Sequence, residues 1–168
     1  LLPGGNGYRQ AGTVDALEHL ERGELPLEVR TDPVLKTVAY EEGLSALLKV
    51  FLGTETLYMH SPPSVRASVP GRVTSLVPWH QDCAYNPHLA DFVSVWVPLV
   101  SVGGDCGGVR IVPRSHVYGA CGHHKPVFGP WSCAVDDGDW CKNESHHLYM
   151  DPCDVLLFHP CLVHRSEP

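Results

Sequence analysis

Several features are missing from this 168-residue sequence, and each absence removes a class of protein. No apolar run reaches the length of about eighteen residues that a membrane-spanning helix needs, so we expect no membrane span. Lysine and arginine number 12 against 19 aspartate and glutamate residues, which gives a net charge of −7. Nucleic-acid binding needs clustered cations, so this balance argues against it. The first residues also lack the basic flank and apolar segment of a secretory leader.

The seven cysteines include no Cys-x-x-Cys pair, and their odd number rules out complete intramolecular pairing. We therefore expect reduced thiols in an intracellular, cytoplasmic protein. The sequence begins at Leu1 without a methionine and stops at Pro168. We expect a piece of a longer protein, incomplete at both ends, so an organelle-targeting segment outside it stays open. The oligomeric state is also left open.

The pattern along the chain predicts one α+β domain over residues 1–168, with a helical part at 13–53 and strands over 54–168. Thr13 is predicted to cap a helix over 14–22, and Asp32 with Pro33 starts a second helical stretch that ends at Gly53. Short β-prone stretches separated by glycine and proline then predict a double-sheet sandwich or barrel. The predicted strands are residues 55–60, 73–79, 92–100, 109–112, 154–158 and 162–164. Residues 117–150 lack this pattern and are predicted to form a lid or an insertion.

One short motif carries the strongest chemical signal. In an extended strand, side chains two residues apart share a face, so His80 and Asp82 would point the same way. A second imidazole from a distant strand, His164, would complete a surface of two histidines and one carboxylate. Such a set binds Fe(II) and leaves other coordination positions open. The bare spacing is also met by chance, and a hydrogen-bonded histidine with no metal is the alternative.

Four blocks in order resemble the phytanoyl-CoA dioxygenase family. They are His80-Gln81-Asp82 with Trp96, then residues 106–116, then residues 154–160, then His164-Arg165-Ser166. The resemblance covers roughly residues 50–168. It implies a double-stranded β-helix, the jelly-roll or cupin-like core, with the N-terminal helices packed against it. It also implies an enzyme that uses Fe(II), 2-oxoglutarate and O2.

The resemblance assigns roles residue by residue. His80, Asp82 and His164 match the iron ligands. Positions that line the 2-oxoglutarate pocket are matched by Gln81, Trp96, Ser166 and, more weakly, His60. Near the metal ligands and in the predicted lid, the candidate substrate contacts are Tyr85, Asn86 and Trp131. Arg114 stands where the family has glycine, which predicts a slightly different turn.

The implied reaction is hydroxylation of a small organic substrate, lipid-like or a secondary metabolite, with release of succinate and CO2. In the family, an arginine about eleven residues past the second histidine pairs with the distal carboxylate of 2-oxoglutarate, a task that suits a guanidinium. The sequence stops four residues after His164, and Arg165 is expected to face the other way. Either the arginine lies beyond Pro168, the interpretation we favour, or this chain binds no 2-oxoglutarate.

Three alternatives stay open at this stage. In the first, the chain is a catalytically inert family member that acts as a binding or regulatory module. In the second, it is a non-oxygenase cupin-like metalloenzyme such as an isomerase. A third concerns the segment 121–147, whose cysteines and histidines are candidates for a structural zinc site. Their spacings match no standard zinc motif, which makes zinc the less favoured interpretation.

Overall fold

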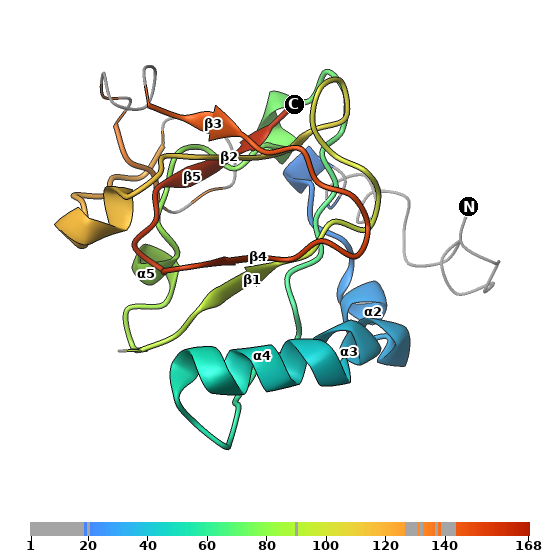
Figure 1. Ribbon diagram of the computed structural model, residues 1–168. Coiled ribbons are helices and arrows are strands. Elements are labelled where there is room, and N and C mark those ends of the chain that lie inside the picture. The colour runs from blue at the N-terminus through green and yellow to red at the C-terminus, as the bar shows by residue number, and fades with distance from the viewer. Residues whose placement is uncertain are drawn as a thin grey trace, which may run out of the picture. The chain divides into compact units, whose positions relative to one another are not determined.

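The computed structural model describes residues 19, 21–89, 91–126, 131, 133–136, 138 and 144–168. The chain divides into two compact units, Leu1–Ala67 and Ser68–Pro168 (Figure 1). The first contains helices and the second contains the strands, which confirms the α+β class. In the described part of the chain no helix has both the length and the apolar character that crossing a membrane requires. The helix predicted over residues 14–22 lies mostly outside the described residues.

In the described part of the first unit, three helices follow one another after residue 26: α2 (Leu27–Arg30), α3 (Pro33–Ala39) and α4 (Glu42–Leu52). The Asp32 carboxylate accepts a hydrogen bond from the Val34 N–H at 2.8 Å, so α3 begins as predicted with a capping side chain and a proline in its first turn. The helical stretch is interrupted at Tyr40, because Glu41 caps a new helix by accepting from the Leu44 N–H at 2.7 Å. Gly53, with a left-handed φ of 63°, ends α4.

The described residues of the second unit form five short strands in two antiparallel sheets. The smaller sheet pairs β1 (Ser94–Trp96) with β4 (Leu156–Phe158). The larger has β2 (Gly108–Ile111) at its centre, between β3 (His146–His147) and β5 (His164–Glu167). Three single-turn helices complete the unit: η1 (Val73–Ser75), α5 (Asp82–Tyr85) and η2 (Ser115–Tyr118). Figure 1 shows the two sheets as separate layers, with α5 at one end of them.

Several predicted strands are wrong or too long. Residues 55–60 form no strand, and residues 73–75 form the helix η1. There the Ser75 hydroxyl accepts from the Val69 N–H and donates to the Arg72 carbonyl, which satisfies the backbone locally and favours a turn over a ladder. The strand predicted over 92–100 is limited to 94–96, and Pro98, which has no N–H to donate, follows it closely. The last strand begins at His164 and continues to Glu167.

A buried core cluster of the second unit includes the residues immediately before His80 and His164. Trp79, Val112 and Val163 form one cluster of buried side chains, with Cys121 packed against it. The Val112 N–H donates to the Val163 carbonyl at 2.9 Å. Two of these core residues immediately precede His80 and His164, so packing of the core fixes where both histidines begin.

Candidate metal centre

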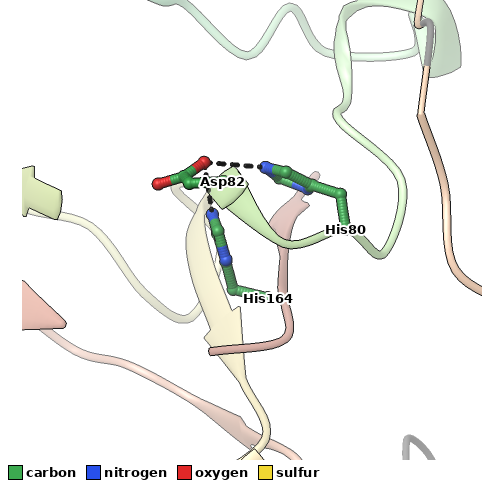
Figure 2. Close-up of side chains that lie close together, drawn as sticks. All are labelled: His80, Asp82 and His164. Carbon is green, nitrogen blue, oxygen red and sulfur yellow. Dashed lines mark ion pairs between the residues drawn. The ribbon is translucent and has the colours of Figure 1, made fainter. Parts of the chain in front are cut away.

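The structure brings His80, Asp82 and His164 together (Figure 2). Asp82 Oδ1 lies 3.6 Å from His80 Nε2 and 3.7 Å from His164 Nε2. One ligand-type atom from each residue lies within 4.8 Å of the other two. Both histidines are buried and Asp82 is half-buried. Among the described residues this is the only such group of three or more histidine, cysteine or acidic side chains.

Backbone pairing positions the two histidines. His80 and His164 exchange both of their N–H···O hydrogen bonds, each 3.0 Å long, as one antiparallel pair. The motif does not continue as a strand, because Asp82 is the first residue of α5. Gln81, which lies between His80 and Asp82, is extended, with φ −127° and ψ 138°. The alternation predicted for a strand therefore holds over these three residues, and His80 and Asp82 face the same side.

Both imidazoles are held in the same tautomer by their own backbone. His80 Nδ1 lies 2.8 Å from the Pro78 carbonyl oxygen, and His164 Nδ1 lies 2.9 Å from that of Leu162. A carbonyl oxygen only accepts hydrogen bonds, so each Nδ1 carries the hydrogen. In the neutral ring Nε2 then has a free lone pair, and both Nε2 atoms face Asp82. This is how metal-binding histidines are usually oriented.

The Asp82 carboxylate is held from its other side by Ser94 of β1. The Ser94 hydroxyl donates to Asp82 Oδ2 at 2.5 Å, which leaves Oδ1 for the two imidazoles. Burial by itself would raise the pKa of Asp82, but the neighbouring His80 and His164 imidazoles and the hydrogen bond from Ser94 lower it to about 2. Asp82 is therefore an anion at neutral pH.

His164 is neutral at the same pH. Burial, followed by the nearby His80 imidazole, lowers the pKa of His164 from 6.5 to about 4, against the opposing effect of Asp82. The Phe158 ring of β4 packs edge-on against His164, with ring centroids 4.7 Å apart. The smaller sheet thus contributes Ser94 to the carboxylate and Phe158 to the imidazole, and the centre lies between the two sheets.

These three side chains fit a divalent metal ion such as Fe(II). The separations of 3.6 and 3.7 Å are too long for direct hydrogen bonds, so the Nε2 and Oδ1 atoms converge without satisfying one another. Two neutral imidazoles and one carboxylate are the donor set of mononuclear Fe(II) sites that keep positions open. The backbone carbonyls and Ser94 supply the outer hydrogen bonds that such ligands require.

Gln81 points away from the three ligand-type side chains. Its side chain is fully buried, and its amide group donates to the Gly119 and Cys161 carbonyls at 3.0 and 2.6 Å. Its amide oxygen accepts from the Cys121 N–H at 2.7 Å. These contacts favour a structural role over the contact with 2-oxoglutarate that the resemblance implies.

The other residues predicted to contact 2-oxoglutarate are placed differently. Trp96 is half-buried and shares a face of β1 with Ser94, and Ser166 shares a face of β5 with His164. Both therefore stay candidates for the pocket. His60 is exposed and belongs to the first compact unit. Arg165 faces the other way, as predicted: its guanidinium lies 4.9 Å from the Trp79 ring centre and pairs with Glu167.

Two of the three candidate substrate residues lie beside the centre. The Tyr85 ring packs edge-on against His80 at 5.5 Å between centroids, and its hydroxyl donates to the Cys133 carbonyl at 2.9 Å. Asn86 ends α5 by donating from its side chain to the Asp82 carbonyl at 3.2 Å, so it supports the motif's backbone. Trp131 is half-buried in the second unit.

The cysteine- and histidine-rich segment shows no second metal group among its described residues. His123 Nδ1 is 2.8 Å from the Cys121 carbonyl, and His147 Nε2 is 2.9 Å from the Gly107 carbonyl. Cys141, which the zinc interpretation needs, lies outside the described residues. Part of this segment is regular structure, because β3 pairs with β2 and His124 forms an isolated bridge with Ala134.

Sequence reasoning missed Ser94 and Phe158. Ser94 belongs to none of the four blocks, and Phe158 lies in the block 154–160 without an assigned role; the pairing of β1 with β4, which aligns these two residues, brings them to Asp82 and His164. Ser115, which lies in the block 106–116, has a structural role. Its hydroxyl accepts from the Val163 N–H at 2.8 Å and so supports the residue before His164.

The fold and site together define a class of protein: a two-sheet α+β domain with a candidate mononuclear metal centre of two histidines and one aspartate. Residues 10–168 match the sequence profile of phytanoyl-CoA dioxygenase (PhyH). The chain belongs to the phytanoyl-CoA dioxygenase family.

Individual relatives are distant oxidoreductases. The chain is similar to 1-deoxypentalenic acid 11-beta-hydroxylase of Streptomyces arenae, with 31% identity over 124 residues, covering 71% of this chain and 43% of the relative. It is 28% identical over 151 residues to a probable phytanoyl-CoA dioxygenase of Caenorhabditis elegans, covering 80% and 46%. The human peroxisomal phytanoyl-CoA dioxygenase is 27% identical over 127 residues, covering 71% and 37%. The chain thus spans less than half the length of these relatives.

Proposed function

We propose that this protein is an Fe(II)- and 2-oxoglutarate-dependent dioxygenase that hydroxylates a small organic substrate. The observation that carries the proposal is the convergence of His80 Nε2, His164 Nε2 and Asp82 Oδ1, each oriented by hydrogen bonds elsewhere in the second unit. Membership of the phytanoyl-CoA dioxygenase family supports the choice of iron and 2-oxoglutarate.

Each residue has a distinct task in this proposal. His80 and His164 would hold the iron through neutral Nε2 atoms, and Asp82 would hold it through Oδ1. With O2 and 2-oxoglutarate, bound iron supplies an oxidative decarboxylation that yields succinate and CO2 and hydroxylates a C–H bond. Phe158 and Tyr85 shield the two imidazoles from water, and a dry site suits this chemistry. The proposal assigns no general base.

The proposal extends to the fold and the cosubstrate pocket. We take the two antiparallel sheets as part of a jelly-roll core. Trp96 and Ser166 would line the 2-oxoglutarate pocket, because each shares a strand face with a residue of the centre. Tyr85 and the segment around Trp131 would contact substrate. The relatives act on 1-deoxypentalenic acid and on phytanoyl-CoA, which supports a lipid-like or secondary-metabolite substrate.

An anaerobic titration tests the proposal. Fe(II) and then 2-oxoglutarate are added, and the weak visible charge-transfer band of the ternary complex is recorded. We expect the band with a chain that extends past Pro168 far enough to include the family's arginine, and a much weaker band with residues 1–168. His80→Ala should abolish it, whereas His88→Ala, a change at an exposed histidine, should not.

The same titration separates the alternatives. Iron binding without a band, even in the extended chain, would favour a cupin-like metalloprotein that does not use 2-oxoglutarate. If the wild-type chain bound no iron, the result would favour an inert family member. A band that is unchanged in His80→Ala would refute the proposed centre.

A further inference from the structure

Two thiols lie in contact beside the candidate metal centre and take no part in the function proposed above. Cys83 Sγ and Cys161 Sγ are 3.6 Å apart. Cys83 follows Asp82 in α5, and Cys161 lies three residues before His164 in the turn that leads into β5. The two cysteines therefore come from the two chain segments that carry all three ligand-type side chains.

Backbone hydrogen bonds hold the two segments that carry these thiols side by side. His80 and His164 form an antiparallel pair with two 3.0 Å hydrogen bonds. Cys83 is three residues after His80, and Cys161 is three residues before His164. The pairing does not continue as a ladder, because α5 begins at Asp82, but the Cys83 N–H donates to the carbonyl of Pro160, the residue before Cys161, at 3.1 Å.

The thiols are also accessible and free to react. Both cysteines are half-buried, so a small oxidant can reach them. Gln81 holds the turn in place through the Cys161 carbonyl, at 2.6 Å. Side-chain rotation can shorten the separation of the sulfur atoms to the bond length of about 2.05 Å, because both atoms already touch and both backbones are fixed.

We propose that Cys83 and Cys161 form an oxidisable dithiol, a modification site at which a peroxide closes a disulfide beside the metal centre. One of the two sulfur atoms attacks hydrogen peroxide, which breaks the O–O bond, gives a sulfenic acid on that cysteine and releases water. The other sulfur then attacks the sulfenic sulfur; the S–S bond forms, the S–O bond breaks, and hydroxide leaves with the proton of the second thiol as a second water. Two thiols lose two electrons and two protons, and one peroxide becomes two waters.

The contact between the two sulfur atoms lets either one make the first attack and the other resolve the sulfenic acid. The product ties the segment that carries Asp82 to the segment that carries His164.

Peptide mapping tests the proposal. The whole chain, treated with a chelator to exclude iron-driven radical chemistry, is exposed to hydrogen peroxide and then alkylated without reductant. We expect the loss of two thiols from a chain with seven cysteines and a mass decrease of about 2 Da, reversed by dithiothreitol. The map needs trypsin with chymotrypsin, because trypsin alone leaves Cys83 joined to Cys106 and Cys161 joined to Cys153.

Matched variants make the result decisive. Cys161→Ser and Cys83→Ala should each abolish the linked peptide, whereas Cys106→Ser, at an exposed free cysteine, should retain it. The oxidised wild-type chain should also unfold at a higher temperature than its reduced form, a shift absent from Cys161→Ser. Linkage of Cys161 to Cys121, or sulfinic acid at Cys83 or Cys161 with no disulfide, would overturn the proposal.

Discussion

At the scale of single residues, the centre depends on atoms that never touch the metal. Each imidazole is oriented by the carbonyl two residues before it, and the carboxylate is oriented by Ser94. Such outer hydrogen bonds fix ligand geometry before the ion arrives, which reduces the cost of assembling the site. The chemistry of Asp82 and His164 is therefore set partly by residues that no motif marks.

Ser94→Ala tests this dependence. The change removes the 2.5 Å hydrogen bond to Asp82 Oδ2 and leaves the carboxylate free to rotate. We expect Mn(II) or Fe(II) affinity to fall about 10- to 100-fold, as it does when outer hydrogen bonds of metal ligands are lost. Isothermal titration calorimetry measures the change. Ser101→Ala is the control, because Ser101 donates a similar 2.6 Å hydrogen bond to Asp151 away from the centre, and equal losses in both variants would contradict the account.

The stability of the metal-free protein should depend on pH through His164 and Asp82. Between pH 6.5 and about 4, His164 is protonated in the unfolded chain but neutral in the folded protein. The free energy of unfolding therefore falls as the pH is lowered through this window. The pKa of Asp82, lowered from 3.8 to about 2, adds a second loss between those values. Urea unfolding near pH 7 and near pH 5 checks the first window.

The control for this pH dependence is a histidine substitution elsewhere. His164→Gln should make unfolding less sensitive to pH between these two conditions. His88→Gln, at an exposed position, should leave the wild-type dependence in place. Equal pH dependence in wild type and His164→Gln would contradict the assigned protonation states.

At the scale of helices, strands and turns, local signals were predictable from sequence and tertiary ones were not. Asp32, Pro33 and Gly53 act within one or two turns of a helix, so the bounds they set match the structure. Strand lengths depend on partners that the sequence does not reveal, and residues 55–60 pair with no strand in the described part of the chain. The His80-x-Asp82 spacing correctly predicted that these two side chains share a face. The turn into α5 and the contact with Ser94 were not predictable, because they depend on pairing between distant segments.

Arg114 illustrates a local signal whose meaning the structure sharpens. It has a left-handed backbone, with φ 66° and ψ 0°, just before η2. A residue with a side chain is strained there, whereas glycine is not. Arg114→Gly should therefore stabilise the protein by about 0.5–1 kcal/mol, after the greater freedom of glycine in the unfolded chain is subtracted. Arg114→Ala keeps the strain and is the control; equal urea midpoints for the two variants would contradict this assignment.

At the scale of the whole molecule, one buried side chain joins three stretches of the second unit. The Gln81 amide group connects the metal motif to Gly119 and Cys121 after η2 and to Cys161 before β5. Methionine has a size similar to that of glutamine, but in Gln81→Met the Gly119 and Cys161 carbonyls and the Cys121 N–H lose their hydrogen-bond partner. We expect a loss of about 2–4 kcal/mol in the free energy of unfolding, measured by urea denaturation. A change below about 0.5 kcal/mol would show that water or rearrangement replaces these contacts.

The central claim is that His80, Asp82 and His164 bind one divalent metal ion, and Mn(II) titration monitored by electron paramagnetic resonance tests it most directly. We predict one Mn(II) per chain, with affinity reduced at least about 100-fold by alanine at any of the three positions. Asp91→Ala, at an exposed carboxylate nearby in sequence, should bind like wild type. Undiminished binding in Asp82→Ala, or no binding by the wild-type chain, would contradict the account.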